Sequence, residues 1–96
     1  AQTQYLIRIE GHTDNVPIRT FLFPSNWELS TARAVNVLRY FIDHHQIDAQ
    51  RLSAEGFGEF QPLMANDTAE NRNKNRRVEV IFIRPENQDS DSGERS

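Results

Sequence analysis

Residues 4–10 read QYLIRIE, and this stretch predicts the first strand of the fold. Ile7 and Ile9 alternate with side chains of the opposite face, and a period of two in β-branched and aromatic residues is typical of a strand. We expect Gly11 to end the strand. Residues 12–25 contain asparagine and prolines and therefore form a predicted loop. A connection of this length without regular structure is often functional.

A long amphipathic helix is predicted after this loop, over residues 26–44. Ser25 and Glu28 fit the capping box, in which both side chains satisfy free backbone N–H groups. Apolar and small residues recur every three or four positions, and we expect this stripe to face the core. The stripe consists of Trp27, Thr31, Ala34, Leu38 and Phe41, widened by Val35 and Ile42. Arg33 lies near its border, close to the preceding loop.

Two strands and a short helix are predicted in the second half of the chain. A strand over residues 51–55 is followed by a turn, and the short helix spans residues 67–73 with Asn66 or Asp67 as its N-cap. The last strand, residues 78–83, is apolar enough for a central place in a sheet. Three strands and one long helix indicate a thin two-layer α/β sandwich.

Composition narrows the classes of function. The chain has 96 residues, which is room for one domain, and its mean hydropathy is −0.73. The net charge of −3 lies entirely in residues 85–96, so residues 1–84 are neutral. This balance argues against a general nucleic-acid binder and against electrostatic docking to a membrane. We expect residues 1–84 to form the domain and residues 85–96 to be a disordered acidic tail.

The lack of cysteine and of long apolar runs excludes further kinds of site and segment. The chain has no cysteine, which excludes disulfides, thiolate metal sites and a cysteine nucleophile. The longest strictly apolar run is residues 80–83. We therefore expect neither a transmembrane helix nor a signal peptide within this chain.

Charged residues near the first loop and in the last third could carry chemistry. Asp14 follows the first strand, where open α/β sheets often bind ligands, and it could hold an ammonium group, act as a base or only cap the loop. Arg33 offers a planar fork that suits a carboxylate, or it forms a surface salt bridge. Residues 71–77 carry four cations that could receive phosphate, nucleic acid or carboxylates, or simply end a helix in solvent.

Metal binding is a weaker alternative for the first loop. His12 and Asp14 would need a third ligand, since zinc sites use three or four. His44 or His45 could supply it only from the far end of the predicted helix. We therefore predict no metal site.

Enzymatic motifs are weak as well. Ser25 or Ser30 could be combined with the histidine and aspartate of the first loop, but no G-x-S-x-G elbow supports a catalytic triad. The glycines at 56 and 58 lack the third glycine of a dinucleotide-binding fingerprint. We predict no cofactor.

Four segments in register carry the most specific signal. They read GHTD over 11–14, N-x-x-L-S-x-x-R-A over 26–34, R-L-S-A-x-G-x-G-E over 51–59 and N-R-R-V-E over 75–79. Over about residues 4–84, their order and spacing resemble the OmpA-like peptidoglycan-binding domain. The resemblance implies an α+β fold with a mixed sheet and helices on one face. It also implies that the family's first strand and helix, which normally precede Gln4, are missing here.

The resemblance implies a non-enzymatic, periplasmic domain that holds the peptide stem of peptidoglycan, typically its diaminopimelate. Carried over by motif, Asp14 would bind the ligand's ammonium and Arg33 its carboxylate. Three further residues would line the pocket: Thr13, Asn26 and Leu29. Arg76, the first arginine of the Asn-Arg-Arg motif, would touch the ligand or brace the loop.

Residues 11–18 and 23–30 most resemble the flagellar-stator members of this family. That narrower resemblance implies a cell-wall anchor for an ion channel, with a stator channel subunit as partner and a parent protein anchored in the inner membrane. The alternatives are a general envelope anchor of the OmpA or Pal type and a protein-interaction module. A missing strand would expose a sheet edge, so we expect a homodimer. We expect no nucleic-acid partner and no membrane contact by this chain.

Overall fold

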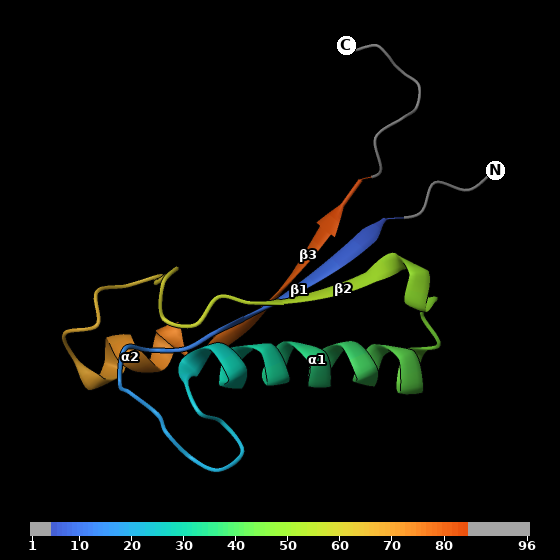
Figure 1. Cartoon of the computed structure of the whole chain (residues 1–96). Coiled ribbons are helices and arrows are strands. Elements are labelled where there is room, and N and C mark those ends of the chain that lie inside the picture. Colours follow the sequence, from blue (N-terminus) through green and yellow to red (C-terminus); the bar gives the residue numbers. More distant parts are fainter. Residues whose placement is uncertain (1–4, 85–96) are drawn as a thin grey trace, which may run out of the picture.

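A computed structural model describes residues 5–84, and the predicted acidic tail lies outside the described residues. The elements are β1 (Leu6–His12), α1 (Asn26–His45), the 3₁₀ helix η1 (Ala49–Arg51), β2 (Leu52–Gly56), α2 (Ala69–Asn75) and β3 (Arg77–Ile83). The predicted two-layer α+β architecture is confirmed (Figure 1). Neither helix combines the length and apolar character that crossing a bilayer requires.

The sheet is mixed, and β1 is its central strand. The strand order is β2-β1-β3, with β1 parallel to β2 and antiparallel to β3 (Figure 1). The prediction that residues 78–83 occupy the centre is therefore wrong. The physical reason is that β1 is buried on both faces, Ile9 on one and His12 on the other, whereas Val80 and Phe82 of β3 remain exposed.

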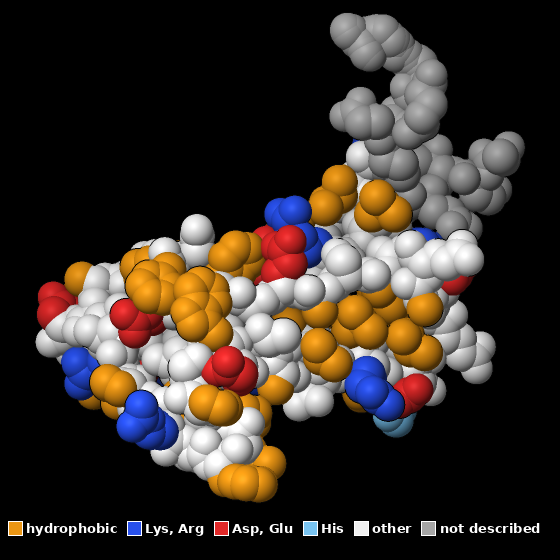
Figure 2. All heavy atoms as spheres, in the orientation of Figure 1, with side chains coloured by type: hydrophobic (Ala, Val, Ile, Leu, Met, Phe, Trp, Pro, Cys, Tyr) orange, Lys and Arg blue, Asp and Glu red, His pale blue; other side chains and the backbone are white. Residues whose placement is uncertain are grey.

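Helix α1 packs over β1 and β2 and forms the second layer (Figure 1). The fully buried hydrophobic side chains are Ile7, Ile9 and Ala34. Partly buried residues packed around them are Val37, Leu38, Phe41, Ile47, Leu52, Ala54 and Val78. This core is small, and hydrophobic side chains also reach the surface in several places on the face that Figure 2 shows.

The N-terminal half of α1 faces the sheet through a smaller side chain than predicted. Trp27 and Thr31 are exposed, and Ser30 is buried in their place. A Cβ atom on Gly11 would lie 2.0 Å from the carbonyl oxygen of Ser30. Helix and strand approach so closely here that only small residues fit between them. Trp27 instead stacks on Phe60, with ring centroids 5.1 Å apart.

The predicted N-cap Ser25 is confirmed, and Glu28 of the predicted capping box binds its hydroxyl. The Ser25 hydroxyl accepts a hydrogen bond from the backbone N–H of Trp27 and donates one to the carboxylate of Glu28. This side-chain hydrogen bond is the main reason that the pKa of Glu28 lies below its ordinary value. The acid also lies in the first turn, where the helix dipole favours a negative charge.

At least one boundary of every predicted helix and strand shifts by one or two residues. Strand β1 continues past Gly11 to His12, and Arg51 belongs to η1 rather than to β2. Helix α2 begins two residues later than predicted, because Thr68 rather than Asn66 or Asp67 is its N-cap. The Thr68 hydroxyl accepts from the backbone N–H of Asn71, whereas Asp67 accepts from that residue's side chain.

Candidate ligand-binding site

A cleft of about 350 Å³ lies where the loop after β1, the first turns of α1 and the end of α2 meet. Its lining residues are Thr13, Asp14, Val16, Pro17, Ile18, Asn26, Leu29, Arg33 and Arg76. All six residues that the sequence singled out line this one cleft. They come from three segments far apart in the chain, and each remains a prediction as a ligand contact.

Asp14 is the acidic group of the cleft, and it is only 6% exposed. One carboxylate oxygen, Oδ1, accepts a hydrogen bond from the backbone N–H of Val16 at 3.0 Å. This Asx turn is the loop-capping role that the sequence offered as an alternative to ligand binding. The other oxygen, Oδ2, forms an ion pair with Arg76. Asp14 therefore closes the loop and carries an oriented negative charge at once.

Arg76, the C-cap of α2, and Arg77, the first residue of β3, point to different places. Arg76 lines the cleft, where it contacts Asp14 and donates to Oδ1 of Asn73 at 3.0 Å. Arg77 pairs with Glu79 and donates to the carbonyl oxygen of Gln61 at 3.0 Å, away from the cleft. Strand geometry explains the split, because successive side chains alternate between faces.

The Arg77 pair also changes the acidity of its partner. The hydrogen bond from Arg77 holds the pKa of Glu79 below its ordinary value, against an opposing effect of burial. The positive charge of Arg77 acts in the same direction as the hydrogen bond. Glu79 is therefore a carboxylate, not a carboxylic acid, at neutral pH.

Helix α1 supplies the basic wall of the cleft. Asn26, Leu29 and Arg33 follow one another at helical spacing and share the face that lines it. Arg33 is exposed, and no carboxylate of residues 5–84 lies within ion-pair distance of its guanidinium. Its planar fork is therefore available to a carboxylate from outside the chain.

Two of the predicted lining residues also fix the loop. The Asn26 side chain donates to the carbonyl oxygens of Val16 at 3.1 Å and Asp14 at 3.4 Å. The Thr13 hydroxyl donates to the Asp14 carbonyl oxygen at 2.9 Å, and the Thr13 backbone N–H donates to Gly58. The position of Asp14 is thus determined by hydrogen bonds from both sides.

Sequence reasoning missed an apolar wall and an internal brace. The wall consists of Val16, Pro17 and Ile18. The sequence predicts a loop at these residues but does not indicate that their side chains line the cleft. The brace is Asn75, fully buried at the end of α2, whose side chain makes hydrogen bonds to Leu63, Met64 and Asn66. The sequence placed Asn75 in the Asn-Arg-Arg motif but gave no signal that its side chain is buried.

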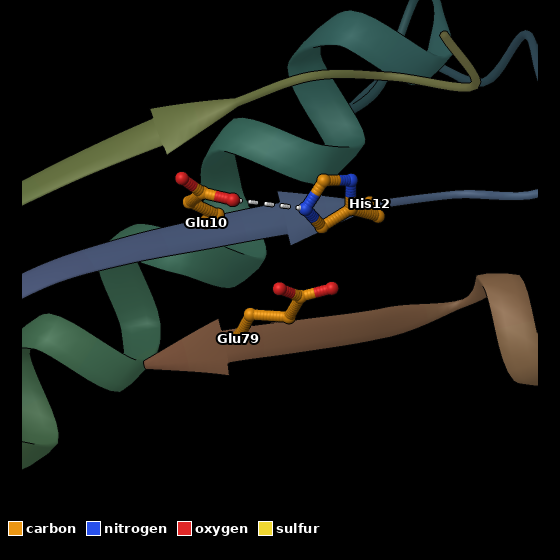
Figure 3. Close-up of side chains that lie close together, drawn as sticks. All are labelled: Glu10, His12 and Glu79. Atoms are coloured by element: carbon orange, nitrogen blue, oxygen red, sulfur yellow. Dashed lines mark hydrogen bonds and ion pairs between the residues drawn. The ribbon is translucent and has the colours of Figure 1, made fainter. Parts of the chain in front are cut away.

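The alternative of a metal site formed by His12 and Asp14 is wrong, because the structure does not bring these residues and a third ligand together. His12 lies on the sheet face opposite α1, next to Glu10 and Glu79 rather than next to Asp14 (Figure 3). The paired histidines, residues 44 and 45, lie in the last turn of α1, whereas Gly11 of β1 meets α1 at Ser30 in its second turn. Their distance along the helix rules out a shared ion.

A mixed three-stranded sheet, one long helix across it and a charged cleft at the end of the central strand define a small α+β domain of a known kind. The OmpA family matches residues 1–76, and the chain belongs to this family. The matched range covers the three segments that build the cleft.

Individual relatives narrow the resemblance. Motility protein B of Bacillus subtilis (strain 168) is 52% identical over 77 residues, which are 80% of this chain and 30% of that protein. A MotB-like protein from Desulfovibrio vulgaris has a similar structure, with a TM-score of 0.78, 46% identity and coverage of 85% of this chain and 52% of that one. The cell wall anchor of the T6SS from Pseudomonas aeruginosa also has a similar structure, with a TM-score of 0.78 and 40% identity. The match covers 86% of this chain and 57% of that one. The chain therefore spans less than a third of the length of the Bacillus relative.

Proposed function

We propose that this chain is a non-enzymatic anchor module that binds the peptide stem of peptidoglycan in the cleft, through diaminopimelate. The observation that carries the proposal is the presence in one cleft of a buried, oriented carboxylate on Asp14 and an exposed guanidinium on Arg33. The similarity to a protein described as a cell wall anchor supports the same conclusion.

The chemistry of the ligand matches these groups. Diaminopimelate ends in an ammonium and a carboxylate on one carbon, linked to the stem by methylene groups. Asp14 would accept hydrogen bonds from the ammonium, and Arg33 would donate two parallel bonds to the carboxylate. The apolar wall and Leu29 would contact the methylene chain, beside the polar lining of Thr13 and Asn26.

Arg76 fits a positioning role in this scheme. Its ion pair with Asp14 orients the carboxylate. Two arginines against one acid leave the cleft with an excess positive charge, which favours a ligand that presents a carboxylate.

The expected affinity for one stem is low. Charged hydrogen bonds contribute on the order of 1.5–3 kcal/mol each, and the cost of association offsets much of that. Strength would come from many stems on one wall and from more than one domain per complex.

We also propose that the parent protein is a flagellar stator subunit of the motility protein B type. The 52% identity to the Bacillus protein supports this assignment. The proposal includes a periplasmic location, an inner-membrane anchor elsewhere in the parent, a stator channel subunit as partner and a homodimer. A general envelope anchor of the OmpA or Pal type is the alternative, and it uses the same cleft.

Co-sedimentation with purified cell-wall sacculi tests the anchor function. We expect Asp14→Asn and Arg33→Ala each to weaken binding at least tenfold, about 1.4 kcal/mol, since each removes one charged partner. Arg39→Ala is the matched control, because Arg39 is an exposed arginine on α1 outside the cleft. Circular dichroism would check that each variant is folded.

Retained binding by both cleft variants would contradict the proposed site. Release of soluble muropeptides from the sacculi by the wild-type chain would contradict the non-enzymatic role. Loss of binding in the Arg39 control as well would indicate a diffuse charge effect instead of a cleft.

A further inference from the structure

A second cluster of charged side chains lies outside the cleft, on the sheet face opposite α1. Glu10 and His12 of β1 and Glu79 of β3 converge there (Figure 3). One ligand atom from each residue lies within 4.8 Å of the other two. We propose that these three side chains form a binding site for a divalent transition-metal ion of the zinc class.

The strand register favours a cation at this position. Glu10 and Glu79 are direct partners across the antiparallel β1–β3 pair, so their side chains leave the sheet on the same face. Like charges directly opposite each other destabilise a sheet. Arg8 and Arg77 relieve part of this repulsion, and a divalent cation between the two carboxylates would add a direct attraction to both. His12, two residues along β1, adds an imidazole nitrogen on the same face.

The spacing of the ligand atoms fits a metal better than a hydrogen bond. Nε2 of His12 and Oε1 of Glu10 lie 3.4 Å apart, which is long for a hydrogen bond. Two atoms bound to zinc at about 2.0–2.2 Å in a tetrahedral arrangement lie about 3.3–3.6 Å apart. A small inward movement of Glu79 would complete a three-ligand set, which leaves the fourth position open.

Neighbouring arginines hold both carboxylates without covering them. Arg8 donates to Oε2 of Glu10 at 2.9 Å, and Arg77 donates to Oε2 of Glu79 at 2.5 Å. The Oε1 atom of Glu10 is left facing His12. Groups outside the ligand set that fix the orientation of ligating carboxylates are a regular feature of metal sites. The arginines also compensate the charge of the two acids before any ion binds.

The imidazole is fixed in place. His12 is 2% exposed and stacks on Phe57, with ring centroids 5.2 Å apart and an interplanar angle of 6°. Its other nitrogen, Nδ1, is buried and has no hydrogen-bond partner among the described residues. The polar contact of the ring is therefore made through Nε2, the nitrogen that faces the carboxylates. One imidazole and two carboxylates form a donor set that suits Zn²⁺ and neighbouring first-row ions.

A bound ion would act on the cleft through the backbone. It would link β1 to β3 immediately before Thr13–Asp14 and shortly after Arg76, and Asp14 and Arg76 are the two partners of the cleft ion pair. It would therefore stiffen the cleft and raise thermal stability in proportion to the logarithm of the free metal concentration.

Calorimetric titration of the 96-residue chain with Zn²⁺, after treatment with a chelator, tests the proposal. We expect one equivalent to bind, with an increase in Tm, and Co²⁺ to give visible absorption bands of a nitrogen- and oxygen-ligated ion. Glu79→Gln is nearly isosteric and alters the least buried of the three ligands. It should lower the affinity at least about tenfold. His12→Gln should abolish the Co²⁺ bands.

The control is the double variant His44→Gln, His45→Gln, because these exposed histidines could bind zinc adventitiously. It should leave binding unchanged. Absence of Zn²⁺ binding by the wild-type chain overturns the proposal. Loss of binding in the control together with full binding by Glu79→Gln also overturns it. If His12→Gln fails to fold, Glu79→Gln and the control still decide the outcome. Sacculus binding is not a readout here, so the result is independent of the anchor proposal.

Discussion

At the scale of single residues, the cleft depends on side chains that bind backbone as much as on those that face outward. Asn26 ties the loop after β1 to α1, and Asn75 ties the segment before α2 to its end. Asn75 directly precedes Arg76, whose guanidinium holds Asp14. The charged pair is therefore only as well positioned as the buried amide next to it.

Asn75→Ala should lower the free energy of unfolding by about 2–4 kcal/mol. The change leaves the backbone N–H groups of Leu63 and Met64 without their acceptor, and loss of the partner of a part-buried polar group costs about 1–3 kcal/mol. Urea unfolding would measure the effect. Asn73→Ala is the control, since Asn73 is exposed and accepts one bond from Arg76, and it should change stability by less than about 1 kcal/mol. Equal effects of the two variants would argue against the bracing role.

At the scale of elements, the contact between α1 and β1 fixes the distance between the two charged walls. Gly11 lies directly beneath Ser30, and Ser30 is buried between the layers. The hydroxyl of Ser30 also accepts from the backbone N–H of Gly58, which ties the loop after β2 to the helix. The start of α1, with Asn26 and Arg33, is thereby held against the end of β1.

Gly11→Ala should prevent folding or cost more than about 3 kcal/mol. The added methyl group would overlap the Ser30 backbone, which cannot move without lifting α1 from the sheet. Gly58→Ala is the comparison, because its φ is +61° but the nearest atoms lie 3.5 Å from the added Cβ. That variant should cost about 1 kcal/mol, from backbone strain alone. Thermal unfolding of both would show whether steric overlap or backbone strain dominates.

The capping box should make α1 stability depend on pH. The Ser25 hydroxyl lowers the pKa of Glu28 in the folded chain, so the contribution is complete above the unfolded value near 4.5. It is lost as pH falls through the lower folded pKa. Glu28→Gln should therefore be less stable than wild type at pH 7, and the difference should shrink below about pH 4.5. Urea midpoints between pH 7 and pH 3 would measure this.

Glu70→Gln is the control for the capping-box prediction, because Glu70 is exposed and its carboxylate lies 3.9 Å from the ammonium of Lys74. It should have a smaller effect at neutral pH. A stability difference between Glu28→Gln and wild type that grew on acidification would contradict the expected direction of the pH dependence.

At the scale of the whole molecule, the two layers do not match in width. Helix α1 covers β1 and β2, and the α1-side residues Val80 and Phe82 of β3 are 37% and 63% exposed. Tyr5 packs edge-to-face against Phe82, with ring centroids 6.2 Å apart, and is 40% exposed itself. A small core beside an exposed apolar strip favours association through that strip.

The chain should therefore self-associate in a concentration-dependent way. Phe82→Lys should shift the equilibrium toward monomer and leave the fold intact, because the side chain is largely outside the core. Sedimentation velocity over a concentration series would measure the shift. Leu22→Lys, on a similarly exposed apolar residue of the loop after β1, is the control and should leave association unchanged. A wild-type chain that stays monomeric throughout would refute the role of the strip.

Local sequence signals were enough to predict both α-helices, the three strands, their order and the segments that carry the site. Strand period, the capping box and the turn residues are local signals, because each depends on neighbours within a few positions. Small errors in the predicted boundaries arose where neighbouring residues could serve equally well as the N-cap, as with Asp67 and Thr68 at the start of α2. The six cleft residues could be named because the family's motifs mark them one by one.

The contacts between those segments are set by packing of parts of the chain that are distant in sequence. The central place of β1, the burial of Ser30 and the ion pair of Arg76 with Asp14 all follow from packing between distant segments. Arg76 and Asp14 are 62 positions apart, and no local pattern encodes their contact. The convergence of Glu10 and Glu79 depends likewise on the register of two strands. That register is set by the free energy of the whole core, which no single stretch of sequence contains.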